Sequence, residues 1–160
     1  AYTAQGLFGM DVFDLSDPTA PEHIDTLSFH AVVFGAEAHG SEIYVALSNR
    51  NVEIYRSIHG ALEPVGEVET AGTPIAVQVH GNTMVVAEAN FFHALKCFVG
   101  LRCWPADVVE VFDITNPGYP VKKTELDFDE AEILFGKLSG NNALLHRRWG
   151  FKVHAPEVQP

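Results

Sequence analysis

Basic residues are scarce in this sequence, and their scarcity excludes several kinds of partner. Lys and Arg together number 10 against 21 Asp and Glu, which leaves a net charge of −11. No short window is rich in Lys or Arg, so nucleic acid and anionic membrane surfaces are not expected partners. Long apolar runs are missing too. Stretches such as residues 31–36 have the length of a strand, far below the roughly 18 residues of a spanning helix.

Cysteine is also scarce, with one residue at Cys97 and one at Cys103. Their close spacing suits a small disulfide loop better than a structural metal site, which takes four ligands in close-spaced pairs. A disulfide here indicates a periplasmic, extracellular or cell-surface location. Two free thiols or a redox switch are the alternatives that the spacing leaves open.

The motifs of several enzyme classes are absent. The sequence has no Gly-x-Ser-x-Gly elbow, no phosphate-binding loop, no Gly-x-Gly-x-x-Gly and no haem-attachment motif. Nucleophilic catalysis and nucleotide chemistry therefore have no support in the sequence. The acidic residues around position 129 are typical of a solvated strand end, and a glycosidase pair across a cleft is not visible in sequence.

What the sequence does contain is a repeated strand and turn. Residues 11–21 read Asp-Val-Phe-Asp-Leu-Ser-Asp-Pro-Thr-Ala-Pro, and residues 110–120 read Glu-Val-Phe-Asp-Ile-Thr-Asn-Pro-Gly-Tyr-Pro. A second repeat, offset by 41 residues, relates residues 39–46 to residues 80–87 through a shared His-Gly pair. A third copy follows at residues 139–145 after a longer interval. A period of about 40 residues built only from strand-like pieces indicates propeller blades of four strands.

Each repeat unit reads as four short strands. Turns centred on Gly40, Gly81 and Gly140 join the first strand to the second, since glycine tolerates positive φ. The first two strands are almost wholly apolar, as expected between neighbouring sheets, whereas the outer two alternate. We therefore expect an all-β fold, a β-propeller made of four-stranded antiparallel blades. The expected strands are residues 32–38, 75–80 and 131–138 (first), 42–47, 83–89 and 143–146 (second), 11–15, 52–57, 108–114 and 151–154 (third), and 22–29, 64–70 and 121–128 (fourth).

The repeated strand and turn resembles the LVIVD-repeat β-propeller family. In that family a strand ending in Val-Phe-Asp-Val is followed by Ser-Asp-Pro, a second proline, another strand and a Gly-Asn hairpin. Residues 12–21 and 111–120 match this pattern, and the resemblance extends over residues 6–145. The middle unit departs from it, because residues 54–60 lack the aspartate and both turn prolines. The resemblance implies a repeat protein with a propeller fold.

The turn itself has a physical explanation that needs no family. Asp17 and Asn116 precede proline, which disfavours the helical region, and their side chains are suited to close Asx turns. Asp14 and Asp113 are expected to accept backbone N–H bonds in the same turns. We interpret all four as structural residues.

The expected blades do not complete a ring. They form one domain over residues 1–160, with partial blades at residues 6–28 and 129–155. Between these come complete blades at residues 29–70 and 71–128. About three blades result, whereas closed propellers have about four to eight. The chain is then a segment of a longer polypeptide or a protomer whose ring other chains complete. Its open blade edges favour a homo-oligomer or a larger complex.

An insertion at residues 90–105 interrupts the second complete blade and is the strongest indication of function. It is long, aromatic and cationic in an acidic protein, and long loops in compact domains are often functional. It belongs to the rim formed by the loops that lead from fourth to first and from second to third strands. Contact with a partner protein is expected there, and a ligand lid or simple packing is the alternative. The residues expected to bind a partner are Phe91, Phe92, Arg102, Trp104, Arg147, Arg148 and Trp149.

The eight histidines raise a metal hypothesis. His30, His93 and His146 belong to the same rim, and Glu130 is a possible carboxylate ligand. None of them has a recognised ligand spacing.

Two functions follow from these features. The first is a non-catalytic propeller scaffold or recognition module of an exported or cell-surface protein, which binds other proteins through its rim loops and needs no cofactor. The alternative is a metal- or cofactor-dependent enzyme with its site at the mouth of the propeller channel.

Overall fold

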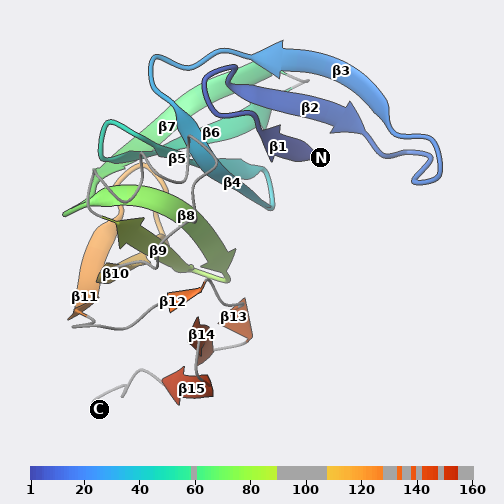
Figure 1. Cartoon of the computed structure of the whole chain (residues 1–160). Coiled ribbons are helices and arrows are strands. Elements are labelled where there is room, and N and C mark those ends of the chain that lie inside the picture. The colour runs from blue at the N-terminus through green and yellow to red at the C-terminus, as the bar shows by residue number, and fades with distance from the viewer. Residues whose placement is uncertain are drawn as a thin grey trace.

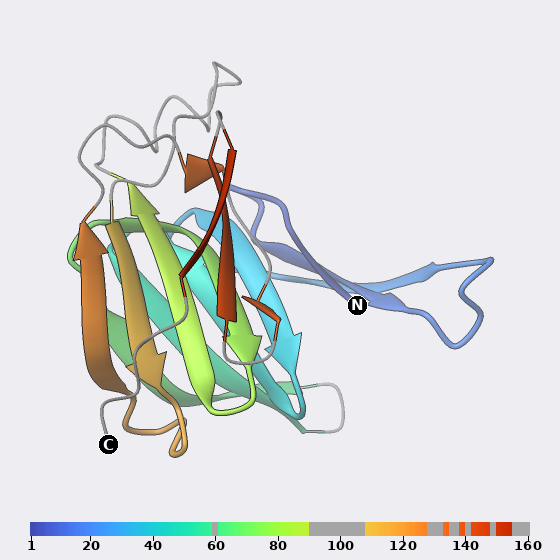
Figure 2. The same ribbon diagram turned by 90° about the horizontal axis from the view of Figure 1, so that it is seen from below.

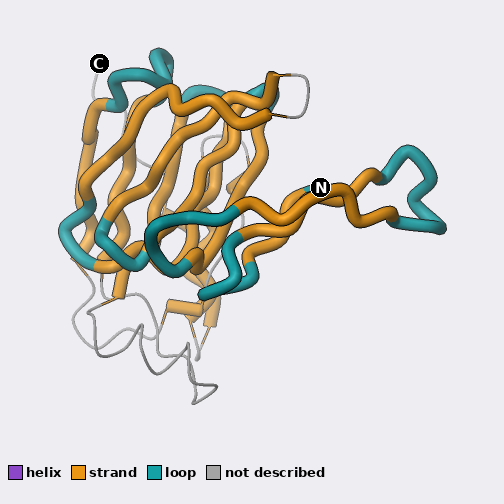
Figure 3. Tube along the Cα trace, turned by 90° about the horizontal axis from the view of Figure 1, so that it is seen from above, coloured by secondary structure: helices purple, strands orange, loops and turns teal. Residues whose placement is uncertain are grey.

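Strands and loops make up the whole described part of the chain (Figure 3). The computed structural model describes residues 1–58, 61–89 and 108–127, and it describes the backbone of strand residues 133–134, 138–139, 142–147 and 150–154. These residues include no helix, and so none with the length and apolarity to cross a membrane. The expected all-β fold is confirmed.

The strands form four antiparallel sheets in chain order, one with three strands and three with four. The first sheet contains β1 (Tyr2–Ala4), β2 (Met10–Asp14) and β3 (Glu22–Leu27). The second contains β4 (Val33–His39), β5 (Glu42–Leu47), β6 (Asn51–Ile58) and β7 (Ala61–Glu69). The third contains β8 (Thr73–His80), β9 (Thr83–Ala89), β10 (Val108–Asp113) and β11 (Val121–Asp127). The fourth contains β12 (Ile133–Leu134), β13 (Leu138–Ser139), β14 (Asn142–Arg147) and β15 (Gly150–His154).

The second and third sheets are meanders in which each strand pairs with the next along the chain. Successive sheets lie beside one another from the N-terminal to the C-terminal end (Figure 1). This is the arrangement of blades in an incomplete propeller, as the sequence predicts. Strands β5 and β9 have the predicted bounds residue for residue.

The first and fourth sheets differ from the expected strands. Strand β1 pairs with β2, so the chain opens on a strand that precedes the expected third-strand segment. With three residues, β1 is too short to show an alternating pattern. At the other end, β12 and β13 take the place of one expected strand over residues 131–138, and both pair with β14.

The hairpins β4–β5 and β8–β9 turn through two residues each. His39 pairs with Glu42 and His80 with Thr83, so only Gly40-Ser41 and Gly81-Asn82 lie between the strands. Gly40 has φ 62° and Gly81 has φ 56°, values that an L side chain rarely adopts. The predicted glycine turns are confirmed at these two positions.

The outer strand pairs carry β-bulges at corresponding positions. The register of β2–β3 shifts so that Ile24 is the extra residue, and in β10–β11 the extra residue is Lys123. In β6–β7 the extra residue is Val65, which lies 41 residues after Ile24. A bulge bends the strand and increases its twist, so the three outer strand pairs are bent at the same point.

The predicted Asx turns are also confirmed. Asp14 accepts hydrogen bonds from the backbone N–H and the hydroxyl of Ser16, at 2.7 and 2.6 Å. Asp113 accepts the same pair from Thr115 at 2.9 and 2.7 Å. Asp17, later in the first turn, accepts a hydrogen bond from the backbone N–H of Thr19 at 2.9 Å. Asn116 accepts from the Gly118 N–H at 3.1 Å.

Two apolar clusters hold the first three sheets together. The larger lies between the second and third sheets and the smaller between the first and second. Strand β5 contributes alternately to both, because successive side chains point to opposite faces. Burial of this kind contributes roughly 25 cal/mol for each Å² of apolar surface removed from water. The larger cluster includes Tyr44, Ala46, Ile54, Val86 and Phe112, and the smaller includes Met10, Val33, Ile43, Val45 and Leu47.

Candidate functional site

Hydrogen bonds link three neighbouring loops of the rim within the described residues. Two hydrogen bonds join the β3–β4 and β5–β6 connections. The Ser48 N–H donates to the carbonyl of Val32 at 2.9 Å, and the Val32 N–H donates to the Ser48 hydroxyl at 3.1 Å. Next along the rim, the Arg50 guanidinium donates to the carbonyls of Thr70 and Ala71 at 3.2 and 2.7 Å. Of the loops that the sequence assigns to one rim, the β3–β4, β5–β6 and β7–β8 connections therefore touch one another.

Arg50 has an unusual backbone conformation at this rim. Its φ is 68°, and among the described residues it is the only one other than glycine with a positive φ. Such a conformation costs about 1 to 2 kcal/mol. The two guanidinium bonds and the backbone bond from Thr70 to the Arg50 carbonyl, at 2.9 Å, hold it in place.

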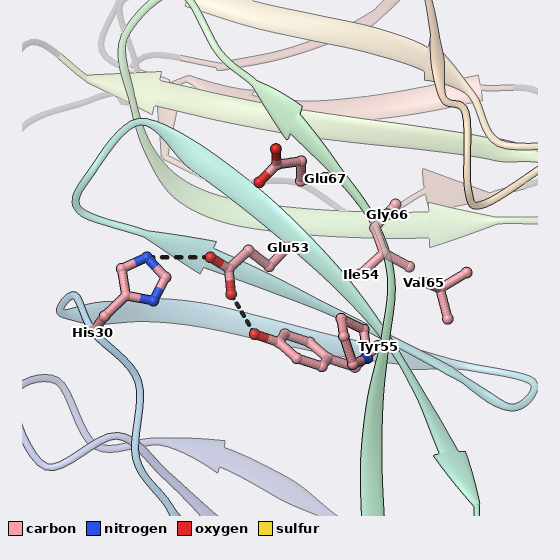
Figure 4. Close-up of a pocket in the computed structure, with 8 residues that line it drawn as sticks. His30, Glu53, Ile54, Tyr55, Val65, Gly66 and Glu67 are labelled. Carbon is pink, nitrogen blue, oxygen red and sulfur yellow. Dashed lines mark hydrogen bonds and ion pairs between the residues drawn. The ribbon is translucent and has the colours of Figure 1, made fainter.

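An open groove of about 410 Å³ lies beside the rim, on β6 and β7 (Figure 4). Its polar lining comes from His30, Glu53, Tyr55 and Glu67, and its apolar lining includes Pro64 and Val65. His30 belongs to the β3–β4 connection, so the groove has a loop on one side and a sheet face on the other. A concave site with a few convergent polar groups on apolar walls is typical of binding sites.

Two glutamates occupy directly opposed positions on the strands that line this groove. Glu53 on β6 and Glu67 on β7 are register partners across the strand pair, and Figure 4 shows both side chains on the same side of the sheet. Like charges at directly opposed positions destabilise a sheet. The two glutamates give the groove its negative charge.

The Glu53 carboxylate has two neighbours that interact with its oxygens. The Tyr55 hydroxyl donates to Glu53 Oε2, and His30 Nε2 lies 3.3 Å from Glu53 Oε1, which forms an ion pair when the imidazole is protonated. His30 Nε2 also lies 3.0 Å from Asn49 Nδ2. Burial, the hydrogen bond to Glu53 and the charges of Glu53 and Glu67 raise the pKa of Tyr55 above its ordinary value. The hydroxyl therefore remains a donor.

A second acidic pair is buried between the sheets at the same rim. Glu88 on β9 and Glu110 on β10 are each 1% exposed. Glu88 accepts a hydrogen bond from the backbone N–H of Gly72, and Glu110 accepts one from Ala71 at 3.4 Å. The loop between β7 and β8 thus rests on both carboxyl groups. A Cβ at Gly72 would lie 3.3 Å from Glu88 Oε2, so glycine allows this approach.

Protonation of Glu88 allows the two carboxyl groups to be buried side by side. Glu88 Oε1 faces no donor, and burial together with the hydrogen bond to Glu110 raises the pKa of Glu88 to about 8. Burial alone would raise the pKa of Glu110. The hydrogen bond from protonated Glu88 and the contact with the Lys122 ammonium outweigh burial and hold the pKa of Glu110 below its usual range. Lys122 bridges Glu110 and Glu125. The pair therefore carries one proton and one charge near neutral pH.

The described residues include few of the site residues predicted from sequence. Among the residues that the structure describes, no three His, Cys, Asp or Glu side chains are grouped to hold a metal ion. His30 lies in the groove with one carboxylate partner. Arg147 and His146 belong to β14, where only the backbone is described. The others, with the proposed disulfide pair, lie outside the described residues: Phe91, Phe92, His93, Cys97, Arg102, Cys103, Trp104, Glu130, Arg148 and Trp149.

Sequence reasoning missed both acidic pairs. Glu88 had a visible signal, because it interrupts the otherwise apolar run of β9, and a charged residue in such a run needs a partner. Glu53 and Glu67 had none, since alternating polar residues on an outer strand are ordinary. Only the register of β6 against β7 shows that they are opposed.

The fold and site define a class of protein: an all-β chain of antiparallel blade-like sheets with an acidic groove at one rim. No protein-family model matches the sequence, and no curated protein matches it either.

Proposed function

We propose that the chain is a non-catalytic recognition module of the propeller type, which binds another protein through its rim loops and the adjoining groove. The opposed carboxylates of Glu53 and Glu67 are the observation that carries this proposal. They suit a cationic side chain of the partner, lysine or arginine, which would relieve their repulsion. Arginine fits best, because its planar guanidinium presents several donors to two carboxylates at once.

The rest of the groove supports the same occupant. The aromatic ring of Tyr55 and the side chains of Pro64 and Val65 offer apolar surface for the methylene stem of an arginine. The net charge of −11 attracts a basic partner over a longer range. Phe91, Phe92 and Trp104, which the sequence predicts to contact a partner, lie outside the described residues, and we keep them as part of the proposal.

We further propose that this module acts in an exported or cell-surface protein and belongs with the LVIVD-repeat propellers. The proposal of export rests on the spacing of Cys97 and Cys103, and the proposal of family rests on the two strand-and-turn copies. Corresponding bulges and Asx turns in the outer hairpins support the repeat.

Titration of the isotope-labelled protein with a short arginine-containing peptide tests the groove. Amide NMR signals of residues around Glu53 and Glu67 are expected to shift, and a peptide of equal length with glutamate in place of arginine is expected to leave them unchanged. The Glu67→Gln variant should bind the peptide several-fold more weakly, since one of two charges is lost.

Glu63→Gln is the matched control, because Glu63 is an exposed acid on the same strand outside the groove lining. It removes the same net charge and should leave binding close to that of the parent. Equal weakening by both variants would mean that overall charge, rather than the groove, attracts the peptide. Absence of any shift would refute the proposed function.

A further inference from the structure

One ring nitrogen of His30 has two partners that require opposite protonation states. His30 Nε2 lies 3.0 Å from the Asn49 amide nitrogen and 3.3 Å from Glu53 Oε1. The amide nitrogen only donates, so it bonds to Nε2 when that nitrogen carries no proton. The carboxylate only accepts, so it bonds to Nε2 when that nitrogen carries one. The two contacts therefore belong to two different states of the same imidazole.

The neutral ring leaves one oxygen of Glu53 to a partner. With its proton on Nδ1, His30 accepts the Asn49 amide at Nε2 and has no proton there to donate to Glu53. The other carboxylate oxygen, Glu53 Oε2, accepts from the Tyr55 hydroxyl. Glu53 Oε1 is then the atom at which the guanidinium of a partner competes with His30 (Figure 4).

The protonated ring takes that oxygen for itself. The imidazolium forms an ion pair with Glu53 Oε1 and places a positive charge beside the position of the incoming guanidinium. The His30 side chain is 64% exposed, whereas that of Glu53 is 12% exposed. Solvent therefore reaches the ring directly, and His30 can gain or lose its proton without unfolding of the sheet.

The groups around the ring leave His30 as the titrating member of the set. The first sheet reaches the edge of the groove through Phe29, whose ring centroid lies 5.7 Å from that of Tyr55. The Arg50 guanidinium is bonded to the carbonyls of Thr70 and Ala71. Of the side-chain types present, only imidazole ordinarily titrates between about pH 5.5 and pH 7.5. The polar and charged side chains around the ring are Asn49 and Arg50 in the β5–β6 connection, Glu53 and Tyr55 on β6, and Glu67 and Glu69 on β7.

We propose that His30 is a proton-dependent gate of the groove: its neutral ring admits the arginine of a partner, and its protonated ring occupies Glu53 and disfavours that arginine. This inference rests on the proposed function and adds its regulation. Coupling between two bound species is reciprocal. An arginine that enters the groove therefore also expels the proton from His30.

The affinity of the arginine-containing peptide at about pH 5.5 and pH 7.5 tests the gate. The parent should bind about fivefold more weakly at the lower pH, the size expected for one exposed charge contact. His30→Gln is never charged and His30→Lys is always charged, so each should bind equally at both pH values, the lysine variant weakly. Salt at about 0.15 M screens remote charges.

His39→Gln is the matched control. His39 is an exposed histidine at the end of β4, across the sheet from the β3–β4 connection that carries His30 (Figure 2). This variant removes the same titrating charge from the protein and should keep the fivefold difference of the parent. Equal loss of the difference in both histidine variants would mean that net charge, rather than the groove, responds to pH.

Two further measurements report on the proton itself. Calorimetric titration near pH 6.5 in buffers of different ionisation heat should show proton release on binding by the parent and none by His30→Gln. The ring nitrogen NMR signals of His30 near pH 8 should show Nε2 without a proton. A peptide that does not bind at pH 7.5 refutes the proposed function and the gate with it. Binding whose pH dependence survives His30→Gln, or a proton on Nε2 near pH 8, overturns the gate alone.

Discussion

Replacing Glu88 with glutamine should remove a large part of the pH dependence of stability. In the folded chain Glu88 keeps its proton up to about pH 8, whereas the ordinary glutamate pKa is 4.5. Between these values the folded state binds one proton more than the unfolded state. The free energy of unfolding therefore falls as pH rises, by up to about 1.4 kcal/mol per pH unit.

The size of the effect is measurable. Between about pH 5 and pH 7 the loss from this single group amounts to roughly 2 to 3 kcal/mol, a large share of the 5 to 15 kcal/mol, approximately, that is typical of a domain. Glutamine is neutral at every pH, and its amide can donate to the Glu110 carboxylate while its oxygen accepts from Gly72. The Glu88→Gln variant should therefore match the parent near pH 5 and exceed it in stability above pH 7.

Urea unfolding at a series of pH values from 5 to 8 gives the comparison directly. Glu125→Gln is the control, because Glu125 contacts the same Lys122 ammonium but has a side chain that is 39% exposed. It should keep the slope of the parent. An unchanged slope in the Glu88→Gln variant would show that the proton does not reside on this pair, and the account of the buried carboxyl groups would be wrong.

Three further predictions concern the backbone and the turns. Gly66→Ala should cost about 1 to 3 kcal/mol of stability by overpacking against Pro117, whereas Gly81→Ala, with open space but positive φ, should cost about 1 kcal/mol; equal costs in thermal unfolding would contradict the contact at Gly66. Arg50→Ala should be about 1 kcal/mol less stable than Arg50→Gly, because both lose the guanidinium bonds and only alanine keeps the strain of positive φ; the reverse order in urea unfolding would refute this. The Thr115 hydroxyl and backbone N–H and the Lys123 ammonium lower the pKa of Asp113 to about 2, so its stabilisation is present above about pH 4 and lost as pH falls towards 2. Asp113→Asn should flatten that acid limb, and a limb of unchanged steepness would exclude the pairing.

The regular part of the fold was predictable from residues with strong local preferences. Gly40 and Gly81 mark two-residue turns because few other residues adopt their φ, and the apolar runs that follow these turns give β5 and β9 their bounds. The Asx turns were equally legible, since Asp or Asn before proline leaves the backbone few alternatives. These signals act within a few residues and need no tertiary contact.

The groove was not predictable because it depends on register. Glu53 and Glu67 lie on different strands, and a shift of one residue would place them on opposite faces. The bulge at Val65 sets that register, and bulges leave little trace in sequence. Burial of Glu88 and Glu110 is also a tertiary property, because it requires the loop through Gly72 to fold over both side chains.

Gly66 has a consequence for the geometry of any closed propeller built from these sheets. The contact of its backbone with Pro117 lies at the outer strands, which are farthest from the centre of a closed propeller, so it sets how closely these two sheets approach at their outer edge. A small separation there means a narrow wedge for each blade, and narrow wedges fill a circle only when there are many of them. A larger side chain at this one position would widen the wedge and favour a ring of fewer blades. The absence of a single methyl group at this position thus favours a propeller with more blades.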